Sequence, residues 1–138
     1  MARWLLDTCI LVNALRNPKG AEAERLRRMR PDEVCTSVIV AGELRLGALK
    51  APPVRVADRA ANALLDSLEV EPLTAPVDRF YSRLRAHREA RGLLMGANDL
   101  WIAAHAMALD CVLVTSDKGF SGIEGLTVET WLRGPRTS

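Results

Sequence analysis

Five short runs dominated by apolar residues, each too short to form a helix, constrain the fold of this chain more than any other feature. The clearest, Val112-Leu113-Val114-Thr115, is rich in β-branched residues and contains no charge. An unbroken apolar run of this length is typical of a strand that is buried on both faces of a sheet. The other four runs cover residues 4–6, 34–36, 70–73 and 126–128.

Segments with helical periodicity separate these runs. Apolar residues recur at spacings of three and four over 10–15, 21–30, 38–49, 57–68, 77–91 and 99–109. Ser37 and Asn98 are suitable N-caps for the third and sixth of these helices, and Gly92 is a suitable end for the fifth. Strands alternating with helices predict one α/β domain over residues 1–133, followed by a short tail over 134–138. Its small parallel sheet has about four to five strands, with helices on both faces.

Four acidic residues lie at the junctions between these predicted elements. Asp7 ends the first strand, and Asp117 lies two residues beyond the 112–115 strand. Asp99 is in the first turn of the helix that leads into that strand, and Glu43 is in the helix that leaves the second strand. Ligands of open α/β sheets bind at the carboxyl ends of the strands. We therefore expect the four acids to converge on one rim of the sheet.

Four crowded carboxylates would repel one another unless a cation neutralised them. Oxygen ligands suit the hard cations Mg²⁺ and Mn²⁺, which activate water and stabilise charge on a phosphate group. The pattern therefore indicates metal-dependent phosphodiester hydrolysis. Each acid also has a structural interpretation: Asp7 and Asp117 as turn or cap residues, Asp99 as a complement to the helix dipole, and Glu43 as a solvated helix residue.

Composition narrows the class of protein further. The net charge of +2 is too small to identify a nucleic-acid-binding protein, and although arginine supplies 16 of the 19 basic residues and suits phosphate, codon bias explains that equally well. Cys9, Cys35 and Cys111 are odd in number and show no Cys-x-x-Cys spacing, which argues against a disulfide framework or a zinc site. Asp7 interrupts the N-terminal apolar run too early for a signal peptide, and no run approaches the roughly 20 apolar residues of a membrane span. These features predict a soluble cytoplasmic protein.

Other phosphoryl-transfer classes lack their motifs. The chain has no glycine-rich phosphate loop, and Asp7 is followed by Thr8-Cys9 instead of completing the Asp-x-Asp of an aspartyl-phosphate phosphatase. A receiver domain would need an acidic pair after the first strand and a further Asp at the end of a central strand, where Val70-Glu71-Pro72 is a poor substitute.

Several further side chains have two interpretations each. Five arginines in the 77–91 helix are either a phosphate-contacting flank or a solvated helix face; they are Arg79, Arg83, Arg85, Arg88 and Arg91. Lys118 either contacts a phosphate beside Asp117 or is solvated. His87 and His105 are expected to be structural or surface residues. Trp4, Trp101 and Trp131 are expected in the core or in dimer contacts.

At the four acids the sequence resembles the PIN-domain nucleases, and within them the VapC-type toxins of bacterial type II toxin–antitoxin pairs. The resemblance covers nearly the whole chain. Its motifs are Leu6-Asp7-Thr8, Ser37-x-Ile39-x-x-x-Glu43-Leu44-x-x-Gly47, Gly96-x-Asn98-Asp99-Leu100-x-Ile102-Ala103-Ala104, Val114-Thr115-x-Asp117-x-x-Phe120 and Gly125-Leu126-x-Val128-Glu129-x-Trp131.

The resemblance implies a PIN-like fold and an Mg²⁺- or Mn²⁺-dependent endoribonuclease that acts on RNA, often structured RNA such as tRNA. It implies that Asp7, Asp99 and Asp117 are metal ligands and that Glu43 holds metal or orients the attacking water. Thr115 matches a hydroxyl position that borders the site. The resemblance also implies a homodimer that is silenced by a cognate antitoxin.

The chain departs from the family pattern at three places. Many relatives have Asn at the position of Cys9 and Asn-Asn or a similar pair at Ser116-Asp117, and Trp101 stands where a smaller aliphatic residue is common. The alternative function is a degenerate PIN-fold module that binds RNA or protein without catalysis. Such members lose one or more of the acids, whereas all four are present here.

Overall fold

The computed structural model describes residues 3–131 and contains one five-stranded sheet, all of whose strand pairs are parallel. The strands are β1 (Trp4–Leu6), β2 (Val34–Ser37), β3 (Glu69–Glu71), β4 (Val112–Val114) and β5 (Val128–Glu129), arranged in the order β3-β2-β1-β4-β5. The predicted parallel α/β fold is therefore confirmed. The predicted tail over 134–138, and residues 132–133 of the predicted domain, lie outside the described residues.

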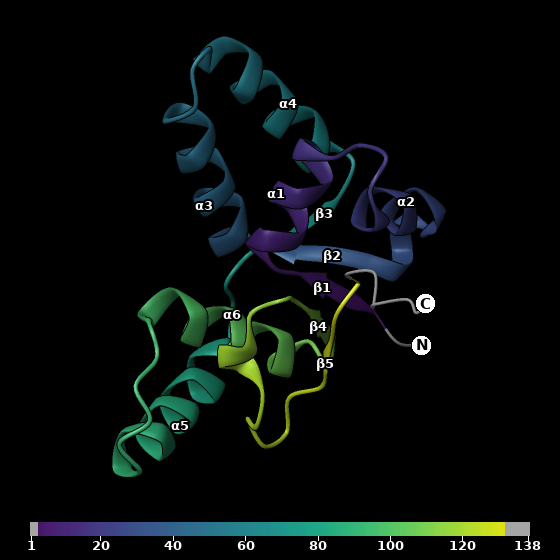
Figure 1. Ribbon diagram of the computed structural model, residues 1–138. Helices are drawn as coiled ribbons and strands as arrows, with labels where there is room; N and C mark the ends of the chain where they lie inside the picture. Colours follow the sequence, from purple (N-terminus) through teal and green to yellow (C-terminus); the bar gives the residue numbers. More distant parts are fainter. Residues whose placement is uncertain (1–2, 132–138) are drawn as a thin grey trace, which may run out of the picture.

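Six helices cover the two faces of this sheet (Figure 1). They are α1 (Thr8–Arg16), α2 (Ala21–Arg28), α3 (Val38–Leu49), α4 (Val54–Asp66), α5 (Val77–Ala90) and α6 (Ala97–Ala108), with single 3₁₀ turns η1 (Pro31–Glu33) and η2 (Lys118–Phe120). Crossovers between parallel strands are right-handed. Since the chain proceeds from β1 toward β3 and then returns to β4, α1 to α4 lie on one face and α5 and α6 on the other. Within the described residues no helix is long and apolar enough to span a membrane.

The centre of the core is formed by β1 and β4. Leu5, Leu6, Leu113 and Val114 on these strands have no exposed surface. Central strands of a parallel sheet are covered by helices on both faces, which explains why both sequences are apolar without alternation. The two strands are held in the register that places Leu6 level with Val114. This register brings the ends of β1 and β4 to the same edge.

Several predicted boundaries were wrong by one to three residues, and three of them have a clear cause. The sixth helix begins at Ala97 and has Gly96, not Asn98, at its N-cap, because the amide of Leu100 donates its hydrogen bond to the carbonyl of Gly96. The fourth begins at Val54 because the carbonyl of Pro53 already accepts from the amide of Ala57. The last strand is Val128–Glu129 instead of 126–128, because pairing with β4 places Val128 opposite Leu113.

A buried histidine links the two faces of the sheet. His105 of α6 is completely buried, and its Nδ1 lies 2.8 Å from Oγ of Ser37, which caps α3 by accepting from the amide of Ile39 at 3.0 Å. Burial lowers the pKa of His105 because the charged form would lose its hydration. His105 is therefore a structural residue that ties α6 to the N-terminus of α3, and Ser37 is the cap that the sequence predicted.

Candidate active site

The acidic residues meet at the point where the strand order reverses. From β1 the chain crosses to β2 on one side, whereas β4 lies on the other side of β1. Ligands of open α/β sheets bind in the crevice at such a switch point, outside the carboxyl ends of the strands. Asp7 follows β1 directly and Thr115 follows β4 directly, so both side chains lie at this crevice.

Asp7 is held in one orientation by its neighbours. The residue is only 6% exposed and is the N-cap of α1, where Oδ1 accepts from the amide of Thr8 at 2.8 Å. Its second oxygen, Oδ2, accepts from the hydroxyl of the buried Thr115 at 2.7 Å. These contacts spread over both carboxylate oxygens and stop the side chain from rotating.

Thr115 also positions Asp117. Its Oγ1 accepts from the amide of Asp117 at 3.0 Å, while the Asp117 carboxylate caps η2 by accepting from the amide of Gly119 at 2.8 Å. Asp117 is exposed, whereas Phe120 at the end of η2 has no exposed surface. The buried ring of Phe120 therefore anchors the short turn that presents Asp117 at the rim. Lys118, the next residue, is exposed.

Glu43 reaches the rim from α3 and is held by two donors. One carboxylate oxygen accepts from the hydroxyl of Thr8, and the other accepts from Nδ2 of Asn98 at 3.1 Å. Sequence reasoning missed this role of Asn98 and treated the residue as a helix cap. Its place beside Asp99 in the first turn of α6 was the available signal.

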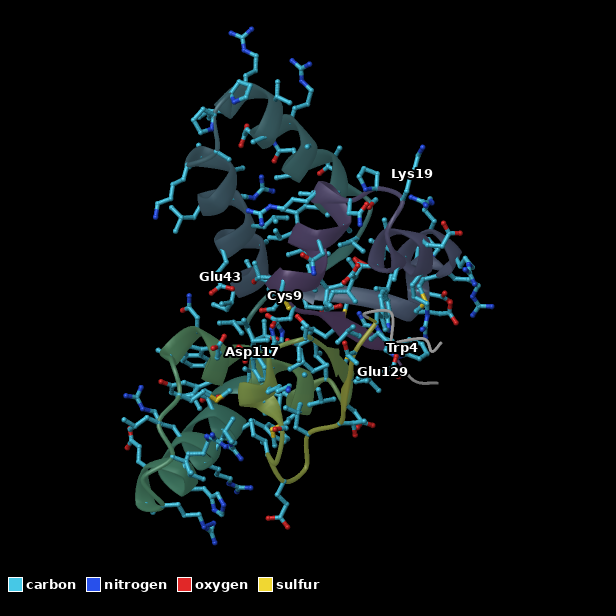
Figure 2. The ribbon with its side chains drawn as sticks, viewed as in Figure 1. Trp4, Cys9, Lys19, Glu43, Asp117 and Glu129 are labelled. Atoms are coloured by element: carbon cyan, nitrogen blue, oxygen red, sulfur yellow. The ribbon has the colours of Figure 1, made fainter. Side chains whose placement is uncertain are left out.

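The four carboxylates lie within one another's electric field. Burial raises the pKa of Asp99 to about 6, and the charges of Asp7, Asp117 and Glu43 contribute in the same direction. Burial also raises the pKa of Asp7, with smaller contributions in the same direction from Glu43 and Asp117. In Figure 2, Glu43 and Asp117 approach the same central region from α3 and from η2, with Cys9 close by. The structure thus brings together the four acids that the sequence singled out.

These donors fit a hard divalent cation in their chemistry, since all are carboxylate oxygens and their mutual repulsion is relieved by positive charge. Among the described residues, however, no three His, Cys, Asp or Glu side chains are positioned to hold one ion together. Asp99 accepts no hydrogen bond from the described part of the chain, so no such bond fixes the orientation of its carboxylate. Coordination by three of the acids therefore requires side-chain rotation toward a shared ion.

Cys9 lies against the same carboxylate. Its Sγ is 3.8 Å from Oδ2 of Asp7 and 3.6 Å from Oγ1 of Thr115, and it accepts from the hydroxyl of Ser116 at 3.3 Å. All three cysteines of the chain are free thiols. The thiol of Cys9 thus fills the space beside Asp7 where the family pattern led us to expect an asparagine.

The stacking of Trp101 on a neighbouring aromatic ring accounts for the large side chain at this position. Its indole stacks on the ring of Tyr81 from α5, with ring centroids 3.7 Å apart and planes 8° from parallel. The larger side chain therefore contributes to the packing of α5 against α6, two residues after Asp99.

The fold and its acidic rim define a parallel α/β domain with a carboxylate site at the switch point of the sheet. Comparison with known proteins supports this description of the fold. The PIN domain model matches residues 4–126. Ribonuclease VapC2 of Rickettsia felis is 32% identical, over 93% of this chain and 97% of that protein, and ribonuclease VapC5 of Mycobacterium tuberculosis is 32% identical, over 90% of each. The chain belongs to the PIN-domain family, among relatives named ribonuclease VapC.

Solved structures give the same result. The Rickettsia felis VapBC2 complex bound to a fragment of its promoter DNA contains a chain with a TM-score of 0.85 and 30% identity, covering 93% of this chain and 98% of that one. A DNA-bound VapBC complex from Salmonella typhimurium contains a chain with a TM-score of 0.88 and 26% identity, covering 95% of this chain and 99% of that one.

Proposed function

We propose that this protein is a metal-dependent endoribonuclease and the toxin of a toxin–antitoxin pair. The observation that carries the proposal is the convergence of Asp7, Glu43, Asp99 and Asp117 on one rim, where burial and the neighbouring charges raise the pKa of Asp99 to about 6. A site that collects negative charge is unsuited to a phosphodiester until a cation is bound. The names of the VapC relatives support RNA as the substrate.

Asp7, Asp99 and Asp117 would hold Mg²⁺, with Mn²⁺ as a substitute. Such an ion lowers the pKa of bound water and offsets the charge that develops on phosphate. Glu43, which Thr8 and Asn98 hold in place, helps to hold metal or orients the attacking water. Thr115 keeps the Asp7 carboxylate aimed at the rim. In-line attack of the water on phosphorus breaks the bond from phosphorus to the 3′ oxygen, which takes up a proton, and the products carry a 5′-phosphate and a 3′-hydroxyl.

Removal of the metal tests this mechanism. The purified protein should cleave RNA with Mg²⁺ or Mn²⁺, lose all cleavage in excess chelator, and recover when the ion is restored. Cleavage should also decline as the pH falls through about 6, because protons then compete with the ion for Asp99. Gel analysis of total tRNA and a single-stranded RNA measures all three effects. Cleavage that persists in excess chelator would contradict the metal, and RNA binding indifferent to all four acids would favour a non-catalytic module.

The partner implied by the VapBC complexes is a cognate antitoxin. We place it on the α3–α4 side, where Leu46, Leu49 and Val56 are 54%, 59% and 63% exposed. A groove of about 280 Å³ between α1, α3 and α4 includes Val56 and also Glu43. Because exposed apolar surface of this kind marks protein contacts, a partner seated there would reach the edge of the acidic rim.

A negative charge introduced into this groove should weaken antitoxin binding and leave RNA cleavage unaffected. Val56→Asp is expected to weaken antitoxin binding by about a hundredfold, because an unpaired carboxylate would be buried at the interface, and to leave RNA cleavage unchanged. Arg55→Asp, at the neighbouring exposed position outside the groove, is the control. Calorimetry with a cognate antitoxin measures binding by the two variants, and gel analysis of RNA measures their cleavage. Equal binding by the two variants would place the antitoxin elsewhere.

Two further parts of the proposal concern the state of the protein in the cell. We expect a homodimer, for which the exposed side chain of Leu94 in the α5–α6 loop, outside the lining of the α5 groove, offers an apolar contact. We also place the protein in the cytoplasm, where its RNA substrate and a reducing environment for its three free thiols are found.

A further inference from the structure

A groove on the α5 side of the molecule is lined by arginines that have no acidic partner among residues 3–131. It has a volume of about 530 Å³ and lies between α5, the end of α6 and the loop after η2. Arg83, Arg88 and Arg91 line it together with His87, and Glu124 is the one acidic residue in its lining. Figure 2 shows side chains tipped with nitrogen gathered around α5.

The charge on this segment is not neutralised locally. Residues 77–91 contain five arginines and two acids, Asp78 and Glu89, so their net charge is 5 − 2 = +3. Arg85 is paired with Glu89 at 2.8 Å and is not part of the groove lining. Within residues 3–131, Arg83, Arg88 and Arg91 form no ion pair, whereas Arg27 and Arg28 of α2 both contact Glu24.

The guanidinium groups of Arg88 and Arg91 have no anionic partner in the described part of the chain. Nε of Arg88 is shielded from solvent and has no partner among the described residues. Nη1 of Arg91 contacts the ring of His87 and no carboxylate within the described residues. A shielded donor without an acceptor is costly. Because Arg88 lines the groove, reorientation of its guanidinium group toward a bound anion would give this donor an acceptor.

The shape of the cluster favours a linear polyanion over a single ion. Arg83, His87 and Arg91 lie at positions i, i+4 and i+8, which share one face of a helix. At 1.5 Å per residue this stripe extends over roughly 12 Å. Apolar side chains, among them Leu93 and Ile123, complete the lining. A row of cations beside an apolar wall suits a chain of phosphates with attached bases.

The groove borders the two segments that carry metal-binding acids. Leu93 precedes Asp99 by six residues, and Gly122 follows Asp117 by five. In Figure 1 the loop after η2 runs beside α5. The acidic rim repels RNA when no cation is bound there, and positive side chains outside the rim would add attraction for the substrate.

We propose that the α5 groove binds the phosphodiester backbone of the RNA substrate outside the cleavage site. Arg83, Arg88 and Arg91 contact consecutive phosphates, and the apolar wall accommodates the faces of the bases. This inference rests on the proposed ribonuclease function and names the surface that gives it affinity for RNA.

The test measures RNA binding and cleavage separately. In an Asp99→Asn background with excess chelator, fluorescence anisotropy of a labelled oligouridine and of labelled total tRNA reports binding without cleavage. The triple variant Arg83→Ala/Arg88→Ala/Arg91→Ala should bind RNA about tenfold or more weakly, and the slope of log K against log salt should become shallower by about 2, since each single-strand phosphate contact contributes about 0.7. With Asp99 intact, the same changes should raise KM for RNA with little effect on kcat.

Matched variants distinguish charge from folding. Arg85→Ala removes a paired arginine from the same helix and should retain the original slope. The triple variant with Lys at these three positions retains the charges and should restore most of the salt slope. If the triple Ala variant has a lowered Tm, the single variants Arg83→Ala and Arg91→Ala, at exposed positions, are measured in its place. Equal salt slopes for the groove variant and Arg85→Ala would overturn the proposal, as would a change in oligomeric state with unchanged RNA affinity. Absence of cleavage by the wild-type protein would instead contradict the ribonuclease function, because the binding comparison does not depend on catalysis.

Discussion

Replacement of Asp99 by Asn is expected to abolish RNA cleavage while making the metal-free protein more stable. Loss of one anionic ligand should slow cleavage by about a thousandfold or more, equivalent to about 4 kcal/mol of transition-state stabilisation. The stability gain has a separate cause. In the folded protein the pKa of Asp99 is about 6, above its ordinary 3.8, because burial and three neighbouring carboxylates disfavour its charge.

The direction of this change in stability follows from the binding of a proton to Asp99. Between pH 4 and 6 the folded state binds the Asp99 proton more tightly than the unfolded state does, so the metal-free protein loses stability as the pH rises through that range. The amide introduced by Asp99→Asn carries no charge and removes this loss, which we expect to be about 1 kcal/mol at neutral pH after allowance for the partial exposure of the side chain.

Urea unfolding with and without Mg²⁺, at pH 5 and pH 7, measures the effect. The wild-type protein should gain stability from Mg²⁺ at pH 7. The Asp99→Asn variant should have a higher free energy of unfolding than wild type without Mg²⁺ and should gain little when Mg²⁺ is added. Asp110→Asn is the matched control, because Asp110 is an exposed residue beyond the same helix with φ of 55°, a conformation that Asn tolerates. A metal-free Asp99→Asn protein less stable than wild type at pH 7 would show that the four acids do not repel one another.

Replacement of Phe120 by Ala should cost about 3–5 kcal/mol of unfolding free energy, because it leaves a cavity where a fully buried ring stood. That is a large share of the roughly 5–15 kcal/mol by which a domain is stable. Phe120 is also the anchor of η2, which presents Asp117, so the affinity for Mg²⁺ should fall together with the stability. Urea unfolding and calorimetric titration with Mg²⁺ measure the two effects.

Phe120→Leu is the companion variant, since it retains most of the buried apolar volume and should cost about 1.5 kcal/mol or less. It should also retain Mg²⁺ binding. A Phe120→Ala protein with full Mg²⁺ affinity at temperatures where it stays folded would show that Asp117 does not depend on this anchor.

Much of the candidate site could be predicted because three of its acids, Asp7, Asp99 and Asp117, follow strands or lie at a helix start. Asp7 and Asp117 come shortly after apolar runs, and the carboxyl ends of parallel strands share one edge of the sheet. The role of Asn98 was predicted wrongly because it depends on a contact with a residue far away in the sequence. Its type suits an N-cap, but the carbonyl of Gly96 accepts the first helical bond, and the side chain donates instead to Glu43, 55 residues away. No local pattern reports a partner at that distance.

The sequence by itself determined the strands, the helices that separate them and the acids at their ends, because periodicity and capping act over a few residues. Only the tertiary structure decided the rest. The sheet order placed β1 beside β4, and this pairing joined Asp7 to Thr115 and Asp117 through one hydroxyl. Packing of α3 against α6 buried His105 on Ser37. Side-chain geometry paired Arg85 with Glu89 and left the other arginines of α5 without an acid in the part of the chain that the structure describes. These contacts join residues that are far apart in the sequence, so they form only when the strands pair and the helices pack on the sheet.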